Sequence, residues 1–152
     1  IYTVIMNMHG NESEISNGVG KGYSFKLNTS DIESLKKKPV QRLVLLQCSV
    51  GKISSAGKNI ASSFARVVSG RVLAGDAEVH NVKDEENHNI NGNPDTFIKD
   101  KQHFYIRYYC DGRGWYTYKY DLDKKAVEYE QIALAGDKHE FRIYQLIDLL
   151  TF

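Results

Sequence analysis

A continuous apolar run, Arg42-Leu-Val-Leu-Leu-Gln47, leads directly into Cys48. Apolar residues at successive positions are typical of a strand covered on both faces, as in a parallel sheet. The segment after it carries apolar residues at helical spacing from Ala56 to Val68, and Gly70 closes this helix. Another apolar run follows at residues 71–74. A strand, a helix and a strand in this order predict a parallel crossover unit.

Another crossover unit is predicted earlier in the chain. Residues 2–8 are rich in β-formers and are halted by His9-Gly10. The glycine-rich stretch at residues 11–24 predicts a loop or hairpin, and a short helix is expected after the N-cap Ser30 and before Pro39. Residues 1–80 are therefore expected to form the parallel α/β part of a single domain that covers residues 1–152.

The second half has a different character. Residues 81–100 are polar and predict an exposed loop, whereas residues 101–130 hold three β-rich runs separated by turn residues and predict an antiparallel meander. Apolar residues from Phe141 to Leu150 predict a C-terminal amphipathic helix. The predicted fold class is α/β, with a mainly parallel sheet flanked by helices, then the meander and the final helix.

Composition narrows the classes of partner. The chain has 20 basic and 19 acidic side chains, so no global charge attracts nucleic acid, and no apolar stretch has the length of a membrane span. The expected partner is a peptide or protein substrate, with no nucleic acid and no membrane span. The chain has two cysteines, and the sequence around Cys48 favours a free thiol and a reducing environment.

His9 and Cys48 are the candidate catalytic pair. Each lies just past the end of a predicted parallel strand, and sites in open parallel sheets form beyond the carboxyl ends of the strands. A thiol becomes nucleophilic when an imidazole or a helix N-terminus favours the thiolate, and the helix expected to open near residues 54–58 would add to this effect. The backbone amides of Gly10 and Cys48 are the expected oxyanion donors. The alternative is a buried structural cysteine and an unrelated surface histidine.

Two short motifs, Met8-His9-Gly10 and Leu45-Leu-Gln-Cys-Ser-Val-Gly51, resemble the His-Gly and Cys-x-x-Gly signatures of the caspase-like cysteine peptidase clan. The resemblance covers roughly residues 2–76 and implies that His9 transfers the proton and that Cys48 forms the acyl-enzyme. The most similar members are cysteine protease domains and effectors of bacterial pathogens, some of them self-cleaving. It thus implies a secreted bacterial protein that acts in a host cytosol. Clan members usually have two strands before the one that ends in histidine, so further core strands are expected upstream of Ile1.

Some of the self-cleaving relatives are activated by inositol hexakisphosphate. The meander stands where they carry an effector-binding flap, and the basic residues that could meet the phosphates are Lys99, Lys101, Arg107, Arg113 and Lys119. The alternative is that these side chains form the solvated face of a hairpin. Asp76 follows the strand at residues 71–74 and is a candidate for selecting a basic substrate residue.

Other site chemistries fit less well. The Gly51–Gly57 segment superficially resembles a nucleotide-binding P-loop, but it has five residues between its glycines where the P-loop has four, and Asn59 replaces the hydroxyl residue that binds magnesium. A tyrosine phosphatase needs an arginine six residues after its cysteine, and in this chain that position is Ser54. Glu78, His80, His88 and His103 lack paired metal-ligand spacing, so no metal site is predicted. The expected function is a cysteine endopeptidase that requires no cofactor. The alternative is an inactive caspase-like binding module with the aromatic meander as its contact surface.

Overall fold

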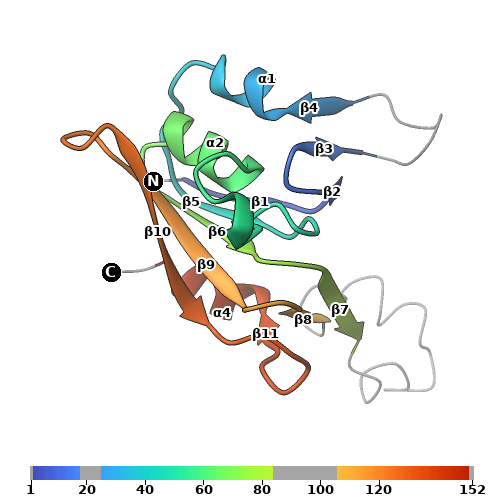
Figure 1. The fold of residues 1–152 in the computed structure, drawn as a ribbon. Coiled ribbons are helices and arrows are strands. Elements are labelled where there is room, and N and C mark those ends of the chain that lie inside the picture. The colour runs from blue at the N-terminus through green and yellow to red at the C-terminus, as the bar shows by residue number, and fades with distance from the viewer. Residues whose placement is uncertain (1, 18–24, 84–105, 151–152) are drawn as a thin grey trace.

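The computed structural model describes residues 2–17, 25–83 and 106–150. A five-stranded central sheet runs through it (Figure 1). The strands of this sheet are, in spatial order, β1 (Tyr2–Met6), β5 (Val40–Leu45), β6 (Arg71–Gly75), β9 (Trp115–Asp121) and β10 (Ala126–Ala133). The pairs β1–β5 and β5–β6 are parallel, and the pairs β6–β9 and β9–β10 are antiparallel.

The middle strands of the central sheet, β5, β6 and β9, are largely buried on both faces. Side chains of successive residues point to opposite faces of a strand, so Leu43 and Leu45 belong to one apolar cluster while Val44 and Leu46 belong to the other. In β9, Tyr118 lies in the first cluster and Trp115 in the second. Burial on both sides explains the continuous apolar run in β5.

Two helices cover the first face (Figure 1). They are α1 (Thr29–Glu33) and α2 (Ile60–Val67), and a short 3-10 turn, η2 (Ile53–Ser55), precedes α2. Ile32 of α1 and Ile60 of α2 are fully buried. On the same side lies a small antiparallel sheet of β2 (His9–Gly10), β3 (Glu14–Ser16) and β4 (Lys26–Asn28).

The second face is covered by another small antiparallel sheet and one short helix (Figure 1). These elements are β7 (Val79–Lys83), β8 (Ile106–Cys110), β11 (Phe141–Arg142) and α4 (Ile143–Asp148). Tyr108, Cys110 and Leu146 are buried against Val44 and Trp115 of the central sheet.

This architecture contradicts the predicted fold class, because the protein is mostly β and its central sheet is mixed, with few parallel pairs. A helix-flanked, mainly parallel sheet is therefore wrong. The described residues contain only three α-helices, and strands form much of the cover on the second face. The aromatic strands β9 and β10 complete the central sheet, where the sequence pattern had predicted a separate meander.

Several boundaries also differ from the prediction. The helix expected near residues 54–58 begins at Ile60, because Asn59 is its N-cap, and α1 is capped by Asn28 instead of Ser30. The predicted meander breaks at its first turn, since β8 pairs with β7 and β11 while β9 pairs with β6 and β10. Strand β7 extends to Lys83, so the polar segment starts later than residue 81. Most of that predicted loop lies outside the described residues.

None of the helices in the described ranges has the length and apolar character needed to cross a lipid bilayer.

Candidate functional site

Cys48 lies three residues beyond the end of β5, at the carboxyl edge of the parallel strands. The amide of Leu46 donates to the Met6 carbonyl at 2.9 Å, so the chain still runs beside β1 as it leaves the strand. The Cys48 side chain is half-buried, and its Sγ lies 3.9 Å from the Val79 carbonyl oxygen. The thiol is thus held at the sheet edge and stays partly accessible.

The backbone turns sharply at the next residue. Ser49 has a φ of +57°, a left-handed conformation that non-glycine residues rarely adopt. Its amide donates to the Ala77 carbonyl at 2.9 Å, which fixes the turn against the segment between β6 and β7. Strained residues of this kind cluster at active sites, where they set the direction of a functional side chain.

The His9-Gly10 segment lies against the segment that carries Cys48. A Cβ atom placed on Gly10 would be 2.9 Å from the Gln47 Cβ and 3.0 Å from the Val50 Cγ1. Only glycine permits this approach, since real Cβ contacts of that length are essentially absent. The two residues that touch Gly10 flank Cys48 in sequence, so the structure brings the predicted His-Gly motif beside the predicted nucleophile.

The imidazole and the thiol do not form a hydrogen bond in the described structure. The His9 side chain is exposed on β2, whereas the Cys48 thiol faces the Val79 carbonyl. Catalytic hydrogen bonds are often long or misaligned in the absence of substrate and tighten only in the reacting complex. The structure thus brings the two chain segments together without bringing the His9 and Cys48 side chains into contact.

The predicted oxyanion donors have different surroundings. Gly10 pairs with Ile15 in the small sheet of β2, β3 and β4. Across the described ranges, the Cys48 amide donates to no other backbone group, although the Ser49 and Gly51 amides are both bonded. The Cys48 amide therefore has no backbone acceptor that competes with a negatively charged oxygen.

The segment at residues 49–59, here termed the post-Cys48 loop, is anchored by buried polar groups. The Tyr118 hydroxyl donates to the Gly51 carbonyl at 2.8 Å and accepts from Asn59 Nδ2 at 3.0 Å. Asn59 Nδ2 also donates to the Lys52 carbonyl at 3.1 Å, while its Oδ1 accepts from the Ser62 amide at 2.8 Å. Burial raises the pKa of Tyr118 to about 12, so the hydroxyl keeps its proton and can donate.

Asp76 lies at the end of β6 and is buried. Its two carboxylate oxygens accept from the backbone amides of Ile53 at 2.7 Å and Arg113 at 2.8 Å. The carboxylate thereby joins the post-Cys48 loop to the turn before β9. This bracing geometry favours a structural role over the predicted selection of a basic substrate residue.

The predicted phosphate-binding residues do not converge where they are described. Arg107 lies on β8 with its Nε 3.3 Å from Glu140 Oε2, and Arg113 lies in the turn before β9. Lys119 lies four residues into β9, roughly 13 Å along the strand from Trp115. It lines a shallow groove together with Arg71, Glu128 and Glu130, so the basic charge there is offset by carboxylates. Lys99 and Lys101 lie outside the described residues, so activation by inositol hexakisphosphate stays a prediction.

Cys110, the second cysteine, is fully buried at the end of β8 and is not paired with Cys48. Burial raises the pKa of the Cys110 thiol to about 12, with the nearby carboxylates of Asp76 and Asp111 also raising it. A thiol that keeps its proton is a poor nucleophile. The two cysteines therefore differ in access, and Cys48 is the one that is partly exposed to solvent.

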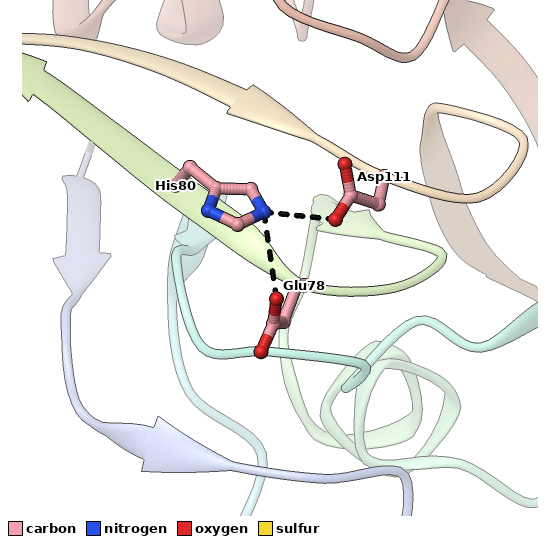
Figure 2. Close-up of side chains that lie close together, drawn as sticks. All are labelled: Glu78, His80 and Asp111. Atoms are coloured by element: carbon pink, nitrogen blue, oxygen red, sulfur yellow. Dashed lines mark hydrogen bonds and ion pairs between the residues drawn. The ribbon is translucent and has the colours of Figure 1, made fainter.

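One cluster of metal-ligand residues was missed by the sequence argument (Figure 2). His80 Nε2 lies 2.8 Å from Asp111 Oδ2 and 3.5 Å from Glu78 Oε2. Glu78 and His80 were considered as ligands, but His88 and His103 lie outside the described residues and Asp111 was not considered. Asp111 follows β8, and only the antiparallel pairing of β7 with β8 reveals that it faces His80.

Comparison of the chain with family models, with curated proteins and with solved structures gives no match. Membership of the caspase-like clan therefore stays a prediction.

Proposed function

We propose that this protein is a cysteine peptidase in which Cys48 is the nucleophile and His9 is the general base and acid. The observation that carries the proposal is the packing of Gly10 on Gln47 and Val50, which brings the backbone of the His9-Gly10 segment against the segment that carries Cys48 beyond the end of β5. The strained turn at Ser49 and the open Cys48 amide support the same assignment.

The reaction follows from these positions. His9 accepts the thiol proton of Cys48 as Sγ attacks the peptide carbonyl carbon and forms a C–S bond. The Cys48 amide donates to the oxyanion of the tetrahedral intermediate. The C–N bond then breaks, and the departing amine takes the proton from His9. Water, deprotonated by His9, hydrolyses the thioester, and the thiol is regenerated.

The competing function is a caspase-like binding module that uses its aromatic strands as a contact surface. Trp115, Tyr116 and Tyr118 of β9 are buried, so they belong to the core and offer no surface to a partner. On the adjacent strand β10, the side chain of Tyr129 is 50% exposed. The burial of β9 weighs against an aromatic contact surface and favours the peptidase.

The experiment measures the rate at which iodoacetamide alkylates Cys48, because it needs no knowledge of the substrate. We expect the His9→Ala variant to be alkylated at least about 10-fold more slowly than the wild type, since the base that generates the thiolate is lost. His139→Ala is the matched control, because His139 is also exposed and takes no part in the proposed site. Its alkylation rate should equal that of the wild type.

Two results would contradict the proposal. One is a Cys48 thiol as slow as a model thiol in both the wild type and the His9→Ala variant, with self-cleavage and hydrolysis of an unfolded protein unchanged by Cys48→Ala. The other is a rate that falls with His80→Ala and stays constant with His9→Ala. The first result favours the binding module, and the second removes His9 as the base.

A further inference from the structure

We infer that Glu78, His80 and Asp111 form a binding site for one divalent transition-metal ion such as Zn²⁺. The three residues, here termed the β7–β8 triad, present one imidazole nitrogen and two carboxylate oxygens. This set of borderline and hard donors suits Zn²⁺ and its first-row neighbours. The inference does not depend on the proposed peptidase activity.

The distances fit a shared coordination shell. Two ligand atoms on one Zn²⁺, each about 2.0–2.2 Å from the ion, are roughly 2.8–3.6 Å apart at octahedral or tetrahedral angles. His80 Nε2 lies 2.8 Å from Asp111 Oδ2 and 3.5 Å from Glu78 Oε2, and all three donor atoms lie within 4.8 Å of one another. The Glu78 and Asp111 oxygens are the pair that must approach each other, and rotation of these two exposed side chains would bring both onto the ion beside His80 Nε2.

The backbone and a ring contact hold the donors in place. Glu78 immediately precedes β7 and His80 is its second residue, so both side chains lie on the same side of the chain. The Asp111 amide donates to the Glu78 carbonyl at 2.9 Å, which fixes the acidic residues relative to each other. The His80 ring stacks on Tyr109, with 4.7 Å between the ring centroids and 20° between the planes. Metal sites of useful affinity need such support around the ligands.

The site is open on one side. The side chains of Glu78, Asp111 and His80 are 66%, 50% and 35% exposed, respectively. An ion can therefore enter from solvent and keep water in its remaining positions, which closed structural zinc sites do not allow. Figure 2 shows the three side chains directed toward one point between β7 and the end of β8.

Binding would brace the strand that contacts Cys48. The Val79 carbonyl lies between Glu78 and His80 in sequence and is the group nearest to the Cys48 thiol in the described hydrogen bonds. An ion that ties Asp111 to both neighbours of Val79 would restrict the movement of this carbonyl. We therefore expect Zn²⁺ to stabilise the folded protein as well as to bind it.

The test is calorimetric titration of Zn²⁺ into the tag-free chain carrying Cys48→Ser, so that the accessible thiol cannot take the ion. We expect one ion per chain, a melting temperature that rises with Zn²⁺, and binding at least about 10-fold weaker in His80→Ala. The Glu78→Gln variant, altered at a highly exposed position, should also bind more weakly. His139→Ala is the matched control and should bind as tightly as the parent chain.

Three results would overturn the inference. They are the absence of Zn²⁺ binding in the parent chain, equal affinity in the His80→Ala and His139→Ala variants, and Mg²⁺ binding as tight as Zn²⁺ binding. The last would mean that carboxylates alone hold the ion, because Mg²⁺ prefers oxygen ligands. Each readout is independent of peptidase activity, so failure here leaves the dyad untouched and failure of the dyad leaves the metal site untouched.

Discussion

Gln47 is a polar residue whose side chain lies in the buried interior of the protein. Its side chain is fully buried beside Cys48, yet neither its amide nitrogen nor its amide oxygen has a hydrogen-bond partner. A buried polar group without a partner loses its hydration and destabilises the fold by about 1–3 kcal/mol. We predict that Gln47→Leu, a replacement of similar volume, raises the free energy of unfolding by about that amount, as measured by urea denaturation.

The matched control for this prediction is Gln131. Its Nε2 donates to the Arg113 carbonyl at 2.7 Å, so this glutamine has the partner that Gln47 lacks. Gln131→Leu should lower the free energy of unfolding by about 0.5–1.5 kcal/mol. Equal and negative changes at both positions would show that the Gln47 amide is satisfied in solution, for example by a buried water molecule.

The conformation of the post-Cys48 loop depends on the side chain of Asn59. The side chain of this buried N-cap bonds the Ser62 amide, the Lys52 carbonyl and the Tyr118 hydroxyl. Asn59→Ala removes the cap and leaves buried groups without partners, so we predict a loss of about 2–4 kcal/mol in the free energy of unfolding. Thermal and urea denaturation measure it.

The other asparagine cap separates capping from burial. Asn28 caps α1 through a bond from the Asp31 amide, and this site is exposed. Asn28→Ala should therefore cost about 1 kcal/mol, the usual value for an exposed cap. If the two alanine variants lost the same stability, the contacts of Asn59 with Lys52 and Tyr118 would contribute nothing.

Sequence pattern identified individual strands better than their partners. The apolar run before Cys48 predicted β5 because burial on both faces removes the usual alternation. The run that became β9 also has four buried residues in succession, but its tyrosines suggested a half-solvated hairpin. Tyrosine suits both settings, because its ring packs in a core while its hydroxyl bonds, as Tyr118 does with Gly51. Residue type therefore could not decide whether β9 paired with β8 or with β6.

The same limit applied to the candidate site. His9 and Cys48 follow predicted parallel strands, so a general rule about strand ends predicts both at one edge of the sheet. The structure has Cys48 beyond β5 and His9 on β2 of a small separate sheet, which that rule does not foresee. Asp111 and His80 are 31 residues apart, and most of the residues between them are polar. Their contact depends on the pairing of β7 with β8, which no local pattern specifies. Ligand clusters formed by such pairing need the structure.

Two buried groups that can lose a proton, the Tyr118 hydroxyl and the Cys110 thiol, make the stability of the whole fold sensitive to high pH. Burial raises the pKa of Tyr118 from 10.0 to about 12 and that of Cys110 from 9.0 to about 12. Above the unfolded-state pKa, the unfolded chain has released these protons and the folded chain still holds them. Stability is therefore fully present below about pH 9 and falls as the pH rises toward 12, by an amount on the order of several kcal/mol.

The measurement is the free energy of unfolding between about pH 8 and about pH 11, compared with Tyr118→Phe and Cys110→Ala. Each variant removes one raised pKa, so its stability should fall less steeply with pH than that of the wild type, whatever its stability at neutral pH. Parallel curves for the wild type and both variants would show that neither proton is held by the fold. The comparison cancels the lysines and exposed tyrosines, which titrate in every chain.

Because the two cysteines differ in exposure, a thiol-labelling reagent should modify only Cys48 while the protein is folded. Cys48 lies at the rim of the sheet, while Cys110 lies with Trp115 and Leu146 in the apolar cluster beneath it. A second label can join a chain only after β8 has separated from the central sheet. The rate at which a second label appears, measured by mass spectrometry, therefore reports how often the elements on the second face separate from the central sheet.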